Sequence, residues 1–243
     1  MLRLGQEREW FEVDRAAMAH ASAELPVPDV LDIGASPFGG VYAISRRMPG
    51  SRFLEEVRVD EVSVAGPMLR RLLDALRSVP PSDAGESWRA WLLRGLDDEP
   101  DHPTAGWRAK LAAHAEADAA FERAAAEVRA LVRDVPERRD LVHGDLLHRN
   151  VLIADDASSV TGIFSWKCST RGDALFDVAW CTFWGDVLHP GIAAAVGDLD
   201  LTDDERARHR CYELQIAASH LGWFAWTDDT PNLGKVVAAV SRR

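Results

Sequence analysis

Apolar positions recur with helical spacing over most of the chain after residue 50, whereas the first fifty residues mix one helix with short strands. Residues 7–24 predict an amphipathic helix that two prolines end. Short apolar runs at Val30–Ile33 and Val41–Ser45 predict two strands joined by a glycine-rich turn, and a Pro-Gly pair stops the second. This pattern divides the chain into a partial small lobe, residues 1–48, and a large lobe, residues 49–243.

The large lobe is predicted to be mainly helical. Between the helices, segment 140–164 alternates short apolar runs with polar turns, as expected for a loop between strands followed by a β-hairpin. Helices are expected at 60–78, 88–93, 105–134, 173–184, 203–226 and 231–242, with Pro67 starting or kinking the first of them.

The composition narrows the classes of partner. The 243 residues carry a formal charge of -11, which argues against nucleic acid and is compatible with a cationic small molecule, although acidity can also serve solubility alone. Three cysteines without CxxC spacing argue against a disulfide framework or a zinc site and fit a reducing cytoplasm. The N-terminus lacks a signal core, and no uncharged apolar run reaches about 18 residues, so no membrane span is predicted.

The strongest chemical signal is the segment 141–153, where an apolar strand runs into His143-Gly144-Asp145 and Asn150 precedes a second strand. Phosphoryl transfer needs a carboxylate beside the attacking hydroxyl and an oxygen ligand for the magnesium ion that neutralises the triphosphate. A short loop between two strands can present Asp145 and Asn150 to one site. The alternative is a surface turn capped by Asp145, with Asn150 in an Asx turn.

This loop resembles that of the aminoglycoside phosphotransferases and their relatives. Downstream, Trp166, Gly172-Asp173 and Asp177 fall into the family's register. The resemblance implies an α+β, protein-kinase-like fold, with ATP and Mg²⁺ as cofactors and a small, cationic, aminoglycoside-like acceptor. It also implies that Asp145 is the catalytic base or orienting group.

The resemblance assigns further roles in the same region. Asn150 would bind the metal, and Ser165 would occupy the position of the family's main metal-binding aspartate. Asp173 and Asp177 would be structural, the first capping a helix and the second bracing the catalytic loop.

Three N-terminal motifs, Leu2-Arg3-Leu4, Leu25–Gly34 and Tyr42–Arg47, resemble those of one branch of the family, the hygromycin B phosphotransferases. In that register, Arg3 falls where kinases place the phosphate-pairing lysine, and Asp14 falls near its acidic partner. Residues 41–47, with Ser45, Arg46 and Arg47, would form the hinge that binds adenine through backbone hydrogen bonds.

Two departures from the family pattern bear on activity. The chain begins at the family's third strand, so two strands and a phosphate-covering loop are expected upstream of it. The stub Leu2–Leu4 is expected to make a poor strand, leaving 30–33 and 41–45 as an exposed edge. Ser165 offers a neutral hydroxyl where hard cations prefer a carboxylate, which is expected to cost on the order of a thousandfold in rate. An impaired kinase, or a degenerate homologue that binds a ligand or partner, is therefore expected.

Other residues in the motif carry open interpretations. His148 is either a phosphate or substrate contact or an exposed loop histidine. Arg149 either pairs with a nearby acid or is solvated. His143 is expected to hydrogen-bond the backbone near the metal-binding turn.

Residues of the C-terminal helices are candidates for the acceptor pocket. Asp186 is the predicted carboxylate for a cationic acceptor. The acids of the stretch 198–205 either line the pocket or stabilise a helix N-terminus, the interpretation we favour. Four tryptophans either stack on a sugar ring or, as we favour, belong to the core: Trp180, Trp184, Trp223 and Trp226.

Overall fold

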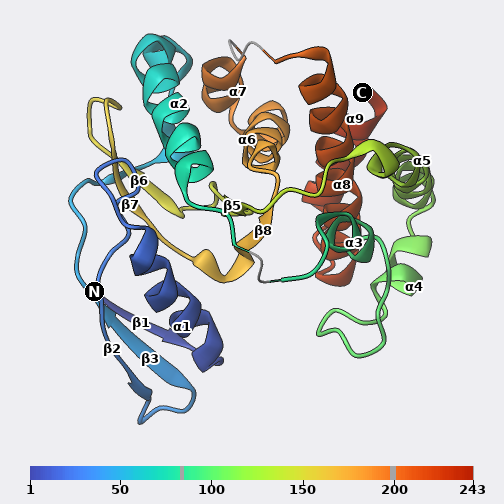
Figure 1. Cartoon of the computed structure of the whole chain (residues 1–243). Helices are drawn as coiled ribbons and strands as arrows, with labels where there is room; N and C mark the ends of the chain where they lie inside the picture. The colour runs from blue at the N-terminus through green and yellow to red at the C-terminus, as the bar shows by residue number, and fades with distance from the viewer. Residues whose placement is uncertain (83–84, 198–200, 243) are drawn as a thin grey trace.

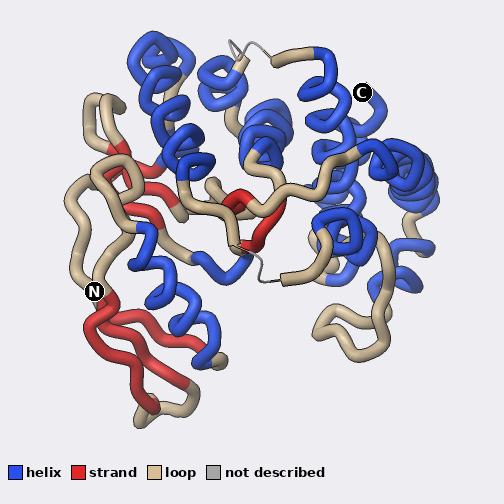
Figure 2. Tube along the Cα trace, viewed as in Figure 1, coloured by secondary structure: helices blue, strands red, loops and turns tan. Residues whose placement is uncertain are grey.

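The computed structural model describes residues 1–82, 85–197 and 201–242. Strands gather on the N-terminal side of the molecule, and helices fill the other side (Figures 1 and 2). The helical part is the larger, as predicted, and the fold is α+β and protein-kinase-like.

An antiparallel sheet with the order β1-β3-β2 forms the N-terminal end (Figure 1). Its strands are β1 (Leu2–Gly5), β2 (Val30–Ala35) and β3 (Val41–Ser45). The expectation for this sheet was wrong in two respects. β1 pairs with β3 along all four of its residues, and β3 is the central strand rather than an edge. The register of β1 explains the difference, because it places Arg3 opposite Ala43, on the face that α1 covers.

The two faces of this sheet differ in burial. α1 (Arg8–Ala17) covers one face, where Phe11, Ile33 and Ala43 form a small core. The opposite face leaves Leu2, Leu4, Leu31 and Ile44 exposed. The helix predicted at 7–24 is shorter than expected: it tightens into a 3-10 turn, η1 (Met18–His20), and the following residues are irregular.

The centre of the molecule holds two small antiparallel sheets. β4 (Arg52–Phe53), β6 (Val151–Ile153) and β7 (Val160–Ile163) form one, and β5 (Asp140–Val142) pairs with β8 (Thr170–Gly172) to form the other. The loop 143–150 joins β5 to β6, so it crosses from one sheet to the other. Both strands that flank the catalytic motif were predicted, whereas β4 and β8 were not.

The helical side contains the main core. α6 is buried on nearly all sides and packs against α7 and α8, and α5 packs against α8 and α9. The helices are α2 (Val62–Ser78), α3 (Trp88–Arg94), α4 (Trp107–Ala112), α5 (Ala115–Leu131), α6 (Leu175–Leu188), α7 (Pro190–Val196), α8 (Asp203–Trp226) and α9 (Thr230–Arg242). Short 3-10 turns are η2 (Leu54–Glu56), η3 (Val59–Glu61), η4 (Val132–Asp134) and η5 (Trp166–Cys168).

Two helix predictions needed correction. The single helix expected at 105–134 is broken at His114, whose backbone leaves the helical region with φ -114 and ψ 83. α7, which begins at Pro190, was not predicted. In the structure this proline occupies the first turn of α7, where its missing N–H costs nothing.

α8 matches its predicted range. Thr202 Oγ1 accepts the Glu205 N–H at 3.2 Å, and the Glu205 carboxylate accepts the Thr202 N–H at 3.0 Å. This capping box confirms that Asp203, Asp204 and Glu205 stabilise a helix N-terminus. Asp198 and Asp200, the other acids of the stretch, lie outside the described residues. No helix within the described ranges is long and apolar enough to cross a membrane.

Candidate active site

One buried carboxylate, that of Asp177, supports the catalytic loop, which is defined here as residues 143–150. Asp177, in the first turn of α6, accepts the backbone N–H of His143 at 2.8 Å and that of Gly144 at 2.9 Å. Burial raises the pKa of Asp177 to about 7, and the two backbone N–H groups oppose that rise. The bracing role expected of Asp177 is confirmed.

His143 connects the catalytic loop to the turn that follows β7, residues 164–166. Its Nε2 donates to the Phe164 carbonyl at 3.0 Å, so Nδ1 is the acceptor for the Asp145 N–H at 3.2 Å. Burial lowers the pKa of His143, which keeps the imidazole neutral and able to accept at Nδ1. The expected backbone hydrogen bond of His143 is confirmed.

Asp145 and Asn150 lie within one hydrogen-bonded unit. The Asn150 side-chain Nδ2 donates to the Asp145 carbonyl at 2.8 Å, which leaves the amide oxygen, Oδ1, as the atom suited to a metal. The Asn150 carbonyl accepts the Phe164 N–H at 2.8 Å and joins the loop to the turn after β7. Asp145 keeps a partly exposed carboxylate, and His148 Nδ1 lies 2.8 Å from its Oδ1.

Ser165 lies in that turn with a left-handed backbone, φ 60 and ψ 56. This region disfavours most side chains and is best tolerated by Gly, Asn and Asp. The next N–H, that of Trp166, donates to Asp14 Oδ1 at 2.8 Å, and the other oxygen of Asp14 pairs with Arg3 Nη1 at 2.6 Å. The Arg3–Asp14 pair expected from the kinase register is therefore present, and the Trp166 N–H bond to Asp14 joins α1 to the turn after β7.

The predicted hinge residues lie at the end of β3. Ser45 is buried, and its hydroxyl lies 3.4 Å from Arg3 Nη2. Arg46 pairs with Asp29 through its guanidinium at 2.7 Å, and its backbone N–H donates to the Asp29 carbonyl. Arg47 is exposed. Nucleotide binding by these three residues stays a prediction.

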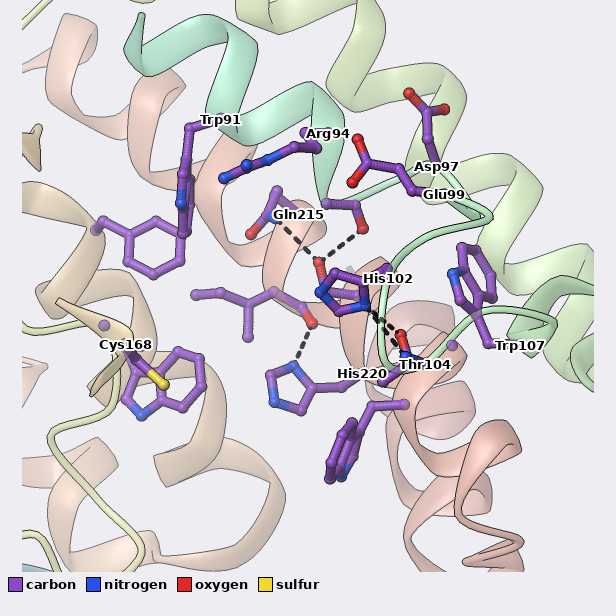
Figure 3. Close-up of a pocket in the computed structure, with 18 residues that line it drawn as sticks. Trp91, Arg94, Asp97, Glu99, His102, Thr104, Trp107, Cys168, Gln215 and His220 are labelled. Atoms are coloured by element: carbon purple, nitrogen blue, oxygen red, sulfur yellow. Dashed lines mark hydrogen bonds between the residues drawn. The ribbon is translucent and has the colours of Figure 1, made fainter. Parts of the chain in front are cut away.

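A cavity of about 460 Å³ opens beside the catalytic loop, between α3, α6, α8 and the segment that joins α3 to α4. Gly144 and Cys168 form its border with the loop, and Gly144 is needed there because a Cβ would lie 2.7 Å from the Cys168 carbonyl oxygen. Figure 3 shows Trp91, Arg94, Asp97 and Glu99 on one side of the cavity and His220 across from them. The aromatic lining residues are Trp91, Trp107, Phe176, Trp180 and Trp223.

The tryptophans of the C-terminal helices do not share one environment. Trp180 and Trp184 are buried, as favoured, but Trp180 also lines the cavity. Trp223 is 47% exposed and lines it too, so for this residue the core interpretation was wrong. Asp186 lies on the exposed side of α6 and is not among the lining residues, and its role in acceptor binding stays a prediction.

Two further acids have defined structural partners. Asp173 Oδ1 accepts the Leu175 N–H at 3.0 Å at the start of α6, which confirms its capping role, and its other oxygen contacts Arg208 and Tyr212. Glu55, which the sequence did not single out, accepts the Arg149 N–H at 2.6 Å. The Arg149 guanidinium lies over the Phe53 ring, so Arg149 meets the acid through its backbone rather than its charge.

The catalytic loop, its two buried braces and the adjoining cavity lie in a protein-kinase-like fold. The sequence profile described as "Phosphotransferase enzyme family" matches residues 6–214, and the chain therefore belongs to that family. Hygromycin-B 4-O-kinase of Escherichia coli is 29% identical over 198 residues, which cover 76% of this chain and 55% of the relative. The chain thus spans about half the length of this curated relative.

Solved structures share the fold. A thermostable mutant of aminoglycoside phosphotransferase APH(4)-Ia, in a ternary complex with ADP and hygromycin B, superposes with a TM-score of 0.85 at 24% identity, over 99% of this chain and 84% of that one. A microcompartment-associated aminopropanol kinase superposes with a TM-score of 0.65 at 16% identity, over 99% of this chain and 84% of that one. At these identities the likeness establishes the fold alone.

Proposed function

We propose that this chain transfers the γ-phosphate of ATP to a hydroxyl group of a small cationic acceptor of the aminoglycoside class. The observation that carries the proposal is the placement of Asp145 and Asn150 in one braced loop beside an aromatic and acidic cavity. Family membership and the hygromycin-B 4-O-kinase relative support both the reaction and the acceptor class.

In this function the cavity binds the acceptor. The exposed carboxylates of Asp97 and Glu99 attract its ammonium groups, and the aromatic side chains cover the faces of its rings. Asp145 then accepts a hydrogen bond from the acceptor hydroxyl, orients it toward the phosphorus atom and takes up its proton. Arg3 pairs with phosphate oxygens, and Ser45, Arg46 and Arg47 hold the adenine.

The residues fit a magnesium ion only in part. Asn150 Oδ1 and the Ser165 hydroxyl are neutral donors, whereas protein magnesium sites usually include one or two carboxylates together with substrate phosphates. Within the described ranges, no three His, Cys, Asp or Glu side chains gather closely enough to hold a metal ion. Magnesium would neutralise the triphosphate charge here, and Asn150 and Ser165 would hold it only with the help of the nucleotide's phosphates. We therefore propose that turnover is impaired.

Transfer of labelled phosphate from ATP, with magnesium, to hygromycin B and kanamycin tests the proposal. We expect slow transfer that Asp145→Ala abolishes. The absence of any transfer that depends on Asp145 would reject the enzymatic function.

The second candidate function is that of a ligand-binding homologue without turnover, which the neutral side chain of Ser165 favours. Calorimetric titration with ATP and with hygromycin B separates the two. Binding of either ligand without phosphate transfer would support the second function, and transfer above the Asp145→Ala blank would reject it.

A further inference from the structure

We propose that His148 is a positioning residue for phosphoryl transfer, which holds the Asp145 carboxylate in the orientation that meets the acceptor hydroxyl. The inference rests on the proposed function. It concerns a side chain that has no part in nucleotide, metal or acceptor binding as described above.

The contact itself fixes the direction of the hydrogen bond. His148 Nδ1 lies 2.8 Å from Asp145 Oδ1, and an ionised carboxylate can only accept, so Nδ1 is the donor. One oxygen of Asp145 is thereby engaged. The carboxylate can no longer rotate freely about its Cβ–Cγ bond, and its second oxygen, Oδ2, keeps a defined direction for the acceptor hydroxyl.

The backbone of the loop is bent to make this contact. His148 has φ 60 and Arg149 has φ 65, two consecutive left-handed residues that are not glycine. Such residues persist only where the surroundings hold them. Here Glu55 accepts the Arg149 N–H at 2.6 Å, and the Arg149 guanidinium lies over Phe53.

Aromatic side chains of α6 fix the other side of the imidazole. The His148 ring meets Trp184 edge-on at 5.3 Å and Trp180 at 6.0 Å between ring centroids. The same helix carries Asp177, which holds the start of the catalytic loop. α6 therefore sets both the backbone that precedes Asp145 and the histidine that orients its carboxylate.

Two substitutions of nearly equal size separate a hydrogen-bond donor at this position from an acceptor. Asn and Asp both tolerate the left-handed backbone, but only Asn keeps a donor at the δ position. We expect His148→Asn to keep kcat within about threefold of the reference chain and His148→Asp to lower it about 10- to 100-fold. The KM for ATP and for hygromycin B should change by less than about threefold in both variants. Equal losses of kcat in the two variants, or a raised acceptor KM at constant kcat, would overturn the proposal.

Nitrogen NMR of the histidine side chains tests the contact without turnover. In the reference chain we expect His148 Nδ1 to carry the proton, and in Asp145→Ala we expect this preference to disappear. A reference chain with the proton on Nε2 instead would overturn the contact. If phosphate transfer is absent altogether, the proposed function fails and this spectrum alone decides the His148–Asp145 contact.

Discussion

The catalytic loop and the turn after β7, residues 164–166, meet at the same site. The loop carries the side chains that the proposed reaction needs, whereas the turn carries the neutral side chain of Ser165. The loop has both its supports and the groups proposed to react: Asp177 holds its backbone, and Asp145 and Asn150 are the proposed catalytic and metal-binding residues. The turn has its supports, because Asp14 holds the Trp166 N–H and Ser165 keeps the left-handed backbone, but its side chain is neutral. The turn thus keeps its backbone geometry without the negative charge that a carboxylate would supply to a metal ion.

The largest effect is expected for a substitution that places a negative charge in the turn. Ser165→Asp should raise the rate of phosphate transfer on the order of 1000-fold, because a carboxylate binds magnesium far better than a hydroxyl. Initial rates at saturating ATP and acceptor measure it. Ser165→Asn is the matched control, since it tolerates the same backbone without the charge. A gain of equal size in the control would show that backbone strain, rather than metal binding, limits the rate.

A second substitution breaks the support of the loop. Asp177→Asn replaces one acceptor oxygen by an NH₂ group that faces a backbone N–H, so the free energy of unfolding should fall by about 3 kcal/mol. Urea unfolding at pH 6 measures the change. Asp74→Asn, at an exposed position of α2, should change the free energy by less than about 0.5 kcal/mol. Equal losses of unfolding free energy in the two variants would argue against a bracing role for Asp177.

The same carboxyl predicts a dependence on pH. Burial raises the pKa of Asp177 to about 7, above the value of about 4 for an aspartate in an unfolded chain. Between these values the folded state binds more protons, so the contribution of Asp177 to stability falls as the pH rises. The difference in unfolding free energy between the reference chain and Asp177→Asn should shrink by about 3 kcal/mol from pH 4.5 to pH 7.5. A difference that grows over this range would mean that the carboxylate, rather than the carboxylic acid, is favoured.

A third substitution breaks the support of the turn. Asp14→Ala leaves the buried Trp166 N–H and the half-buried Arg3 without their acceptor, and should cost about 2 kcal/mol of unfolding free energy. Glu12→Ala, which removes exposed pairs on the same helix, should cost less than about 0.5 kcal/mol. Equal losses of unfolding free energy in the two variants would show that α1 does not support the turn through Asp14.

The smallest effect concerns the backbone of the turn alone. Ser165→Gly relieves the left-handed strain and should raise the unfolding free energy by about 0.5 kcal/mol, after the entropy that glycine adds to the unfolded chain. Ser169, with an ordinary φ of -67, is the control, and Ser169→Gly should lower stability by a similar amount. A lower unfolding free energy in both variants would show that the backbone of Ser165 is not strained.

The sequence predicted those parts of the site that depend on local order. The spacing of Asp145 and Asn150 and the strands that flank them follow from one continuous segment, whereas the role of Asp177, 34 positions from His143, was expected from the resemblance to the family. α8 was predicted over its full length because a capping box marks its start.

Parts that depend on distant contacts were not predictable in this way. Glu55 meets Arg149 across 94 positions, and no pattern in either segment indicates the pairing. The cavity joins the segment after α3 to α8, so Trp223 could not be distinguished from a core residue. The break at His114 interrupts a strong local helix signal, and Pro190 begins α7 at a position where a proline is compatible with a helix.

The contacts between α1 and the turn after β7 have a consequence for ligand binding. Asp14 joins α1 to the Trp166 N–H, and Lys167 lies over the Trp10 ring at 5.1 Å, so the helix and the turn share one interface. Thermodynamic linkage then requires reciprocity: a ligand that binds more tightly when this interface is formed must itself favour the docked helix by the same factor. A fluorescent probe on the outer side of α1 would therefore report the occupancy of a site that the probe never touches.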